Sequence, residues 1–553
     1  MRMSFSSWYR SGSPFVWLNA GAVAISLVMV IGLLMLIAVR GLGHFWPGAI
    51  MESEYRLPGQ SERLVVGEIV ETELVPTLRL ESAGMPVIDA EFMQRDLIKI
   101  GNRDVYGSDF SWVLDAFLMD RRFPEELMTV ERREWGNFYG RLKAVYEGEH
   151  VVASGEDGWQ ELQSRVERAL SIHEEIYEIE KHRIGTINSG LERLRLRERR
   201  HELRGTRTAA VDAAIAAERA QLDADYRVLE AELGELYVRF NRDSMIGVTA
   251  DGSEVRISLG NVVRAFQPNA MGPLDKVAFY GAKLWEFVSE DPREANTEGG
   301  IFPAIFGTVM MVILMSIIVT PFGVVAAVYL REYASQGPIT RAIRIAVNNL
   351  AGVPSIVYGV FGLGFFVYFL GSNIDQLFFP EALPAPTFGT PGLMWAAITL
   401  ALLTLPVVIV ATEEGLSRIP SSVREGSLAL GATKAETLWR VVLPMASPAM
   451  MTGLILAVAR AAGEVAPLML VGVVKLAPSL PLDGNYPYLH LDQKFMHLGF
   501  HIYDVGFQSP NVEAARPLVY ATALLLVVVI AVLNLSAVAI RNHLREKYKA
   551  LEV

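Results

Sequence analysis

Six long apolar segments constrain the fold of this chain more than any other feature. A helix needs about 20 apolar residues to cross the hydrocarbon core of a bilayer, and each segment is at least that long. They occupy residues 16–39, 304–330, 344–370, 393–413, 448–474 and 517–540. Because helices satisfy their own backbone hydrogen bonds in lipid, we expect an all-α polytopic membrane protein with six transmembrane helices. No small-residue cleavage site follows the first segment at Arg40, so we expect a retained anchor and not a signal peptide.

Lysine and arginine residues in the short connections predict how these helices are oriented. Basic residues precede the first segment, follow the sixth, and lie between the second and third and between the fourth and fifth segments. The connection at residues 371–392 has none. We therefore expect a protein of the bacterial inner membrane with both termini in the cytoplasm and residues 41–300 in the periplasm.

Residues 41–300 form a block of ordinary, soluble-looking sequence, and the acidic excess behind the net charge of −11 lies mainly there. An acidic block argues against nucleic-acid binding, which needs basic surfaces. The chain has no cysteine, which excludes disulfides and thiolate metal sites. His497 and His501 have the spacing of a metal pair, but no third ligand is obvious, so we expect a packed loop helix and no metal site.

The block contains two kinds of pattern. Residues 64–80 and 246–265 read as strands, with Asp251-Gly252 as a hairpin turn. Residues 157–242 have apolar side chains at three- and four-residue spacing, with a break near residues 205–208. We expect an α+β periplasmic insert in which a coiled-coil hairpin projects from a β-containing base. The hairpin is either a spacer that packs on itself or a docking arm for a solute-binding protein or a second permease.

The connection between the fourth and fifth segments contains a regular motif. Glu425 is followed six residues later by Gly431, which can end a helix in a left-handed conformation. A second short helix is expected to end before Pro444. Residues 425–444 therefore predict a compact helix–turn–helix with small residues on one face, suited to close docking.

This motif resembles the EAA loop of importer-type ABC permeases, in which an acidic residue, a glycine six positions later and an aliphatic-x-Leu-Pro close recur. Gly426 and Ser427 replace the two alanines of that pattern. In the family, the loop sits in a cleft of the ATPase subunit and passes its motion to the spans. The alternative is an amphipathic surface loop. The resemblance implies that the coupling residues are Glu425, Ala429, Gly431, Ala432, Val441, Leu443 and Pro444.

Two charged residues interrupt the fifth apolar segment. Arg460 and Glu464 have the i, i+4 spacing that puts them on one helix face, where they can pair. A charge inside a span costs at least about 2.5–3.5 kcal/mol and usually marks a substrate path. A guanidinium can hold an oxyanion with two hydrogen bonds, and Pro467 frees backbone groups that a path can use. The alternative is a buried pair that fixes helix register.

Hydroxyl groups in the spans are weaker candidates for the same path. Each could meet an anion, but each is also able to bond to the backbone of its own helix. These residues are Thr308, Thr320, Ser355 and Tyr358.

Three stretches resemble the signature of phosphate permeases of the PstA type. They are Arg460-Ala-Ala-Gly-Glu-Val-Ala-Pro467, the segment 349–359 that reads Asn-Leu-Ala-Gly-Val-Pro-Ser-Ile-Val-Tyr-Gly, and residues 299–308. The resemblance implies the type I ABC importer permease fold. Residues 1–40 are then a cytoplasmic tail and first helix, residues 301–541 the permease core with five helices, and residues 542–553 a second cytoplasmic tail.

The function implied is that of a transmembrane permease subunit of an ATP-driven phosphate importer. The chain has no Gly-x-x-x-x-Gly-Lys-Ser/Thr phosphate loop, so we expect no enzymatic activity and no cofactor of its own. ATP and Mg would be bound by two ATPase subunits of PstB type. The other partners implied are a permease of PstC type, a periplasmic phosphate-binding protein, membrane lipid, and a phosphate-sensing regulator and kinase. Import of another oxyanion such as sulfate or molybdate, or a mainly phosphate-signalling role, remain alternatives.

Overall fold

The computed structural model describes residues 9, 11–477, 479–509 and 512–548. Within these residues, six helices are long and apolar enough to cross a membrane, and each overlaps one predicted segment. They are Ser13–Gly43, Phe302–Tyr333, Ser355–Phe378, Leu393–Ser417, Lys434–Ala462 and Ala515–Glu546.

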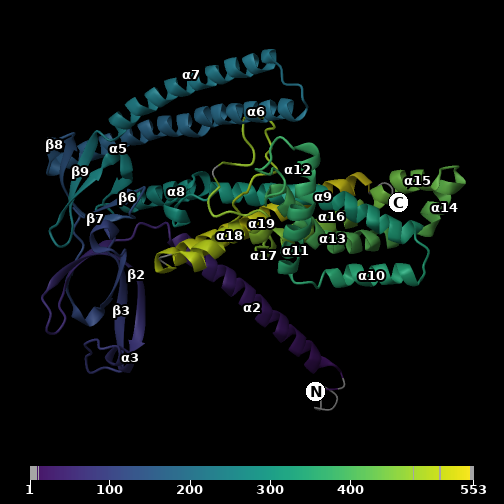
Figure 1. The fold of residues 1–553 in the computed structure, drawn as a ribbon. Helices are drawn as coiled ribbons and strands as arrows, with labels where there is room; N and C mark the ends of the chain where they lie inside the picture. The colour runs from purple at the N-terminus through teal and green to yellow at the C-terminus, as the bar shows by residue number, and fades with distance from the viewer. Residues whose placement is uncertain (1–8, 10, 478, 510–511, 549–553) are drawn as a thin grey trace.

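The first of these helices, α2 (Ser13–Gly43), lies apart from the central bundle (Figure 1). It meets the molecule near its C-terminal end, where it packs against α19 (Val512–Tyr548). Gly41 permits this contact, because a Cβ atom there would lie 2.9 Å from the carbonyl oxygen of Tyr520. The remaining apolar surface of α2 is exposed in the isolated chain, as expected for a lipid-facing helix.

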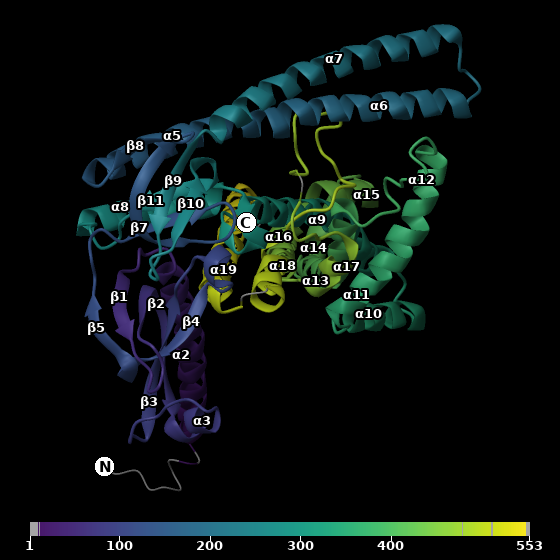
Figure 2. The ribbon, with the colours of Figure 1, turned by 60° about the vertical axis from the view of Figure 1, so that its left-hand side comes forward.

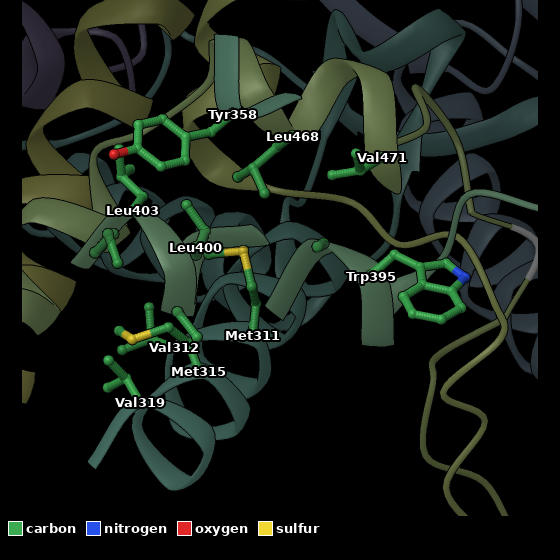
Figure 3. Close-up of a cluster of buried hydrophobic side chains, with 14 of the residues drawn as sticks. Met311, Val312, Met315, Val319, Tyr358, Trp395, Leu400, Leu403, Leu468 and Val471 are labelled. Carbon is green, nitrogen blue, oxygen red and sulfur yellow. The ribbon is translucent and has the colours of Figure 1, made fainter. Parts of the chain in front are cut away.

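The central bundle consists of α9 (Phe302–Val328), α13 (Leu393–Ser417), α16 (Leu443–Ala462) and the third span, which runs from α11 (Ser355–Phe361) to α12 (Ser372–Phe378). Figure 3 shows apolar side chains from α9 and α13 interdigitating at its centre. Tight packing of this kind, without voids, holds helices together where lipid replaces water as the solvent.

The third span begins later than predicted. Residues 338–350 form a separate amphipathic helix, α10 (Pro338–Leu350), and the span starts at Ser355 rather than at residue 344. Pro354 explains the break, since the residue before a proline avoids the helical conformation and the proline itself provides no N–H. Arg341 and Arg344 therefore lie on a helix outside the span.

The fifth span is also interrupted. The predicted segment 448–474 is divided into α16, which ends at Ala462, and a short helix α17 (Ala466–Val471). Gly463, Glu464 and Val465 connect them, and Pro467 lies in the first turn of α17, a position that suits proline.

Residues 50–266 contain two antiparallel sheets. The first has the strand order β4-β3-β2-β1-β5 and the second β10-β9-β7-β6-β11, with β8 paired to β7. The predicted strands lie in β2 (Arg63–Pro76), β9 (Asp243–Val248), β10 (Glu254–Ser258) and β11 (Val262–Phe266), and Asp251-Gly252 forms the predicted turn. The sequence analysis missed seven further strands: β1 (Ile50–Tyr55), β3 (Phe92–Lys99), β4 (Phe110–Leu114), β5 (Leu118–Arg122), β6 (Met128–Arg132), β7 (Phe138–Glu147) and β8 (His150–Ser154).

A long helical hairpin projects from the second sheet and passes over the bundle (Figures 1 and 2). Its outgoing arm joins α5 (Glu156–Tyr177), a π-helical segment (Glu178–Arg183) and α6 (Ile184–Leu203), and α7 (Ala209–Phe240) returns. The Thr208 hydroxyl caps α7 by accepting a hydrogen bond from the backbone N–H of Val211. The sequence pattern therefore located both arms and the turn of the hairpin.

Candidate functional site

Arg460 and Glu464 meet at the break in the fifth span. Arg460 lies in the last turn of α16 and Glu464 just beyond its end, so the pair does not share a helix face as predicted. The Arg460 Nε atom is 3.7 Å from Oε1 of Glu464, which is within ion-pair range but longer than a hydrogen bond. Among the described residues the guanidinium donates no hydrogen bond, so its N–H groups are available to an oxyanion.

Tyr358 and Pro467 lie on elements that pack beside this break. Tyr358 is buried in the same apolar cluster as Ala457 and Ala461 of α16, and it is close enough to Arg460 for the two to interact electrostatically. Its hydroxyl donates to the carbonyl oxygen of Leu350 at 2.6 Å, so it fixes the turn before α11. Pro467 is buried where α17 meets α11.

Gly359 sets the distance between these two helices. A Cβ atom at this position would lie 2.7 Å from the Cα atom of Pro467, and backbone cannot move aside as a flexible side chain can. We expect Gly359→Val to lower the stability of the purified transporter by about 1–3 kcal/mol, the usual cost of overpacking. Gly364→Val, on the same span but facing open space, is the matched control, and equal melting temperatures for the two variants would contradict the argument.

Within the part of the chain that the structure describes, Thr308, Thr320 and Ser355 form no hydrogen bond with Arg460. Thr308 is completely buried, donates to the carbonyl oxygen of Ala304 and accepts from the backbone N–H of Leu498 at 3.0 Å. Thr320 donates to the carbonyl oxygen of Ser316. Both threonine hydroxyls thus bond to the backbone of their own helix, which is the alternative to an anion contact stated above. Ser355 is the first residue of α11.

The two histidines near the last outer loop are buried on and beside α18 (Leu498–Tyr503). His497 Nδ1 accepts from the backbone N–H of Gly499, while Nε2 of both His497 and His501 has no partner among the described residues. Burial lowers the pKa of each to about 4; for His501, Asp504 opposes this shift and Lys475 adds to it. Within the described residues, no three His, Asp or Glu side chains lie close enough to hold a metal ion.

These pKa values predict a loss of stability in mild acid. A depressed folded-state pKa means that the unfolded chain binds more protons between pH 6.5 and pH 4, so stability falls as the pH falls through that window. At pH 5 we expect a loss of about 2 kcal/mol per histidine. Hydrogen exchange of residues 498–503, measured from pH 7.5 to 4.5, should show opening in acid that His497→Gln/His501→Gln reduces. Exchange that does not change with pH would refute this prediction.

The predicted coupling segment is a helix, a turn and a second helix. α14 (Ser421–Ala429) ends before Gly431, whose φ of 89° is left-handed, and Thr433 with Glu436 then caps α15 (Lys434–Thr437). The second helix does not end before Pro444 as predicted. It continues through the π-helical residues Leu438–Val442 into α16, so Pro444 lies within one continuous helical run, Lys434–Ala462.

Side chains anchor this segment on one side and leave the other exposed. Arg424 donates to Glu332 at 2.9 Å and to two backbone carbonyl oxygens, which ties α14 to the end of the second span. Leu438 and Val442 are buried, whereas Leu430 and Trp439 are 91% and 73% exposed. The sequence analysis did not identify Leu430 or Trp439 as candidate docking residues. The signal that could have identified them is an apolar residue beside the turn of a docking motif. The predicted coupling residues Glu425, Ala429 and Gly431 are exposed on the same segment, while Ala432, Val441, Leu443 and Pro444 are partly buried.

The structure thus combines an arginine at the break in an apolar span with an exposed helix–turn–helix between two spans. A family model described as "Binding-protein-dependent transport system inner membrane component" matches residues 319–549. Among solved structures, the inward-facing MetNI methionine ABC transporter is similar at 19% identity over 44% of this chain and 94% of that chain, with a TM-score of 0.33.

Similar proteins from other organisms identify the family within this class of permeases. The phosphate transport system permease PstA of Mycobacterium leprae is 36% identical over 48% of this chain and 78% of the relative. PstA 1 of Mycobacterium tuberculosis (strain CDC 1551 / Oshkosh) is 36% identical over 44% and 71%, and the probable PstA of Methanocaldococcus jannaschii is 31% identical over 46% and 79%. The chain belongs to the family of PstA-type ABC transporter permeases. It is a multi-pass membrane permease of an ABC importer and not an enzyme, since a separate ATPase hydrolyses ATP.

Proposed function

We propose that this chain is the phosphate permease subunit of an ATP-driven importer and that Arg460 contacts phosphate during passage. The observation that carries the proposal is the guanidinium of Arg460 at the break between α16 and α17, which forms no hydrogen bond with any residue that the structure describes. A phosphate oxyanion can accept two parallel N–H bonds from such a group. The Glu464 carboxylate, whose Oε1 atom is 3.7 Å from Nε of Arg460, weakens the attraction between the guanidinium and the anion. The anion can therefore leave again.

The rest of the path is proposed around the same break. Backbone groups near Pro467 and the partly exposed residues of the 463–465 connection can exchange bonds with a passing anion, as irregular backbone does where it lines a cavity. Tyr358 positions Arg460 from the neighbouring span through the buried cluster that both helices share. Ser355 lies at the start of that span, whereas Thr308 supports α18 from behind.

The proposed assembly adds partners to this chain. A PstC-type permease would complete the path; the PstC of Mesorhizobium japonicum is itself 32% identical to this chain over 32% of it and 56% of the relative. The exposed aromatic side chains Phe361, Phe365 and Phe369 of the third span, stacked at 5.1 and 5.6 Å, supply an apolar face for a second membrane subunit or for lipid. Two PstB-type ATPases would dock on residues 425–444 at the cytoplasmic side, with both termini there and residues 41–300 in the periplasm. A periplasmic binding protein would deliver phosphate.

Competition distinguishes phosphate from other oxyanions. Proteoliposomes with the assembled complex, its binding protein and internal ATP are expected to take up labelled phosphate. Unlabelled phosphate should abolish uptake, and a hundredfold excess of sulfate or molybdate should leave it unchanged. Strong inhibition by sulfate or molybdate would indicate that the transporter imports that anion and not phosphate. ATP hydrolysis without uptake of any of the three would favour a signalling subunit.

A further inference from the structure

The far end of the helical hairpin has a charge opposite to that of the rest of the chain. Residues 193–207 hold seven arginines against two glutamates, in a protein of net charge −11. Near the base of the hairpin, residues 157–180 hold seven acidic residues against two arginines. The hairpin therefore has an acidic base and a basic end, and its arginines are Arg193, Arg195, Arg197, Arg199, Arg200, Arg204 and Arg207.

An ion pair holds this basic end against the permease. Arg200 donates from Nε and Nη2 to Oε1 of Glu381, at 3.0 and 2.6 Å. The Glu381 side chain is only 7% exposed, and it belongs to the connection at residues 371–392, which has no lysine or arginine of its own. Figures 1 and 2 both show the loop before α18 rising toward α6 as well. The arginine-rich end thus lies beside the loop that follows the third span.

Part of the basic end remains unpaired. Several of its arginines form ion pairs within the hairpin, such as Arg197 with Glu218. Arg193 and Arg204 are exposed and form no ion pair with any residue that the structure describes. Leu203 is 49% exposed beside Arg204. Arginine is among the residue types that are enriched where a few side chains dominate protein–protein binding energy.

We propose that the arginine-rich end, residues 193–207, is the docking surface for an acidic soluble protein that delivers the anion to the permease. This inference rests on the proposed function, because it assumes that such a protein brings the substrate to the outer loops. Opposite charges accelerate the encounter of two proteins and fix their orientation. The acidic base of the hairpin repels the same acidic surface, so it directs the partner to the end beside Glu381.

The experiment measures association of the phosphate-loaded binding protein with the complete transporter in nanodiscs. In Arg193→Glu/Arg204→Glu, we expect the association rate constant to fall about tenfold at low ionic strength, with the difference shrinking in high salt. The matched control is Arg227→Glu/Arg239→Glu on α7, which changes the net charge equally at two exposed positions that have no ion pair among the described residues. The control should associate like the unaltered transporter.

Two results would overturn the docking surface. One is association that is equally fast in the Arg193/Arg204 variant and the control. The other is capture of vesicles containing phosphatidylglycerol by the unaltered nanodisc complex, lost in the Arg193/Arg204 variant while binding-protein association persists, which would make this end a lipid contact. Phosphate uptake is recorded in the same samples. Normal uptake with unchanged association refutes only the docking surface, whereas absence of uptake in the unaltered transporter refutes the proposed function.

Discussion

Replacing Arg460 with alanine is expected to reduce phosphate uptake by at least about 100-fold while the complex still assembles. Each hydrogen bond to a charged group contributes about 1.5–3 kcal/mol, and the guanidinium can make two to one phosphate. Among the described residues its one ion pair is the 3.7 Å approach to Glu464, so removing the side chain breaks few bonds. Uptake into proteoliposomes and size-exclusion profiles of the detergent-solubilised complex measure the two properties separately.

Companion variants distinguish substrate contact from helix register. Arg460→Lys keeps the charge but loses the planar pair of donors, and it should retain a small part of the uptake. Arg541→Ala, on the exposed end of α19, is the control for loss of a positive charge and should transport normally. If Arg460→Ala transports normally, or if it loses uptake only because the complex no longer assembles, the residue fixes the helix and does not serve the anion.

Replacing Gly431 with valine is expected to separate ATP hydrolysis from transport. The φ of 89° at this position is a left-handed conformation that costs a β-branched residue well over 1 kcal/mol. No atom of the described residues, apart from its chain neighbours, lies within 4 Å of the place that a Cβ would take, so the strain arises from backbone conformation and not from crowding. We expect the number of ATP molecules hydrolysed per phosphate transported to rise several-fold, because the turn between α14 and α15 no longer holds its shape.

Gly431→Asn is the matched control for that experiment. Asparagine has nearly the volume of valine but tolerates the left-handed conformation. It should therefore preserve most of the coupling between hydrolysis and uptake. An unchanged ratio of hydrolysis to uptake in the valine variant, or equal uncoupling by valine and asparagine, would show that the conformation of this turn does not carry the coupling.

The sequence was most informative where local pattern alone decides structure. Apolar runs of about 20 residues, the three- and four-residue spacing in the hairpin, and the Asp251-Gly252 turn each correspond to an element that forms at those residues. The motif around Gly431 likewise predicted its left-handed turn. Seven strands of the two large sheets were missed because short strands have a weak periodic signal and depend on neighbours distant in sequence.

The breaks within the spans were only partly visible in the sequence. Pro354 was present in the quoted motif, yet the apolar residues after Arg344 extended the predicted span across it. In the same way, Gly463 did not by itself indicate that α16 ends there and that Arg460 and Glu464 meet around a helix end. Packing of α17 against α11, with Gly359 beside Pro467, gives that break its position.

By itself, the sequence determined which segments form helices long and apolar enough to cross a membrane and where the hairpin lies, because these follow from local hydrophobicity and spacing. Only the tertiary structure decided that the Arg460 guanidinium donates no hydrogen bond to the residues that the structure describes. It also decided that the arginine-rich end of the hairpin rests on Glu381, which is 181 residues away from Arg200. Such contacts depend on the way separate elements pack in space, and no local pattern encodes them.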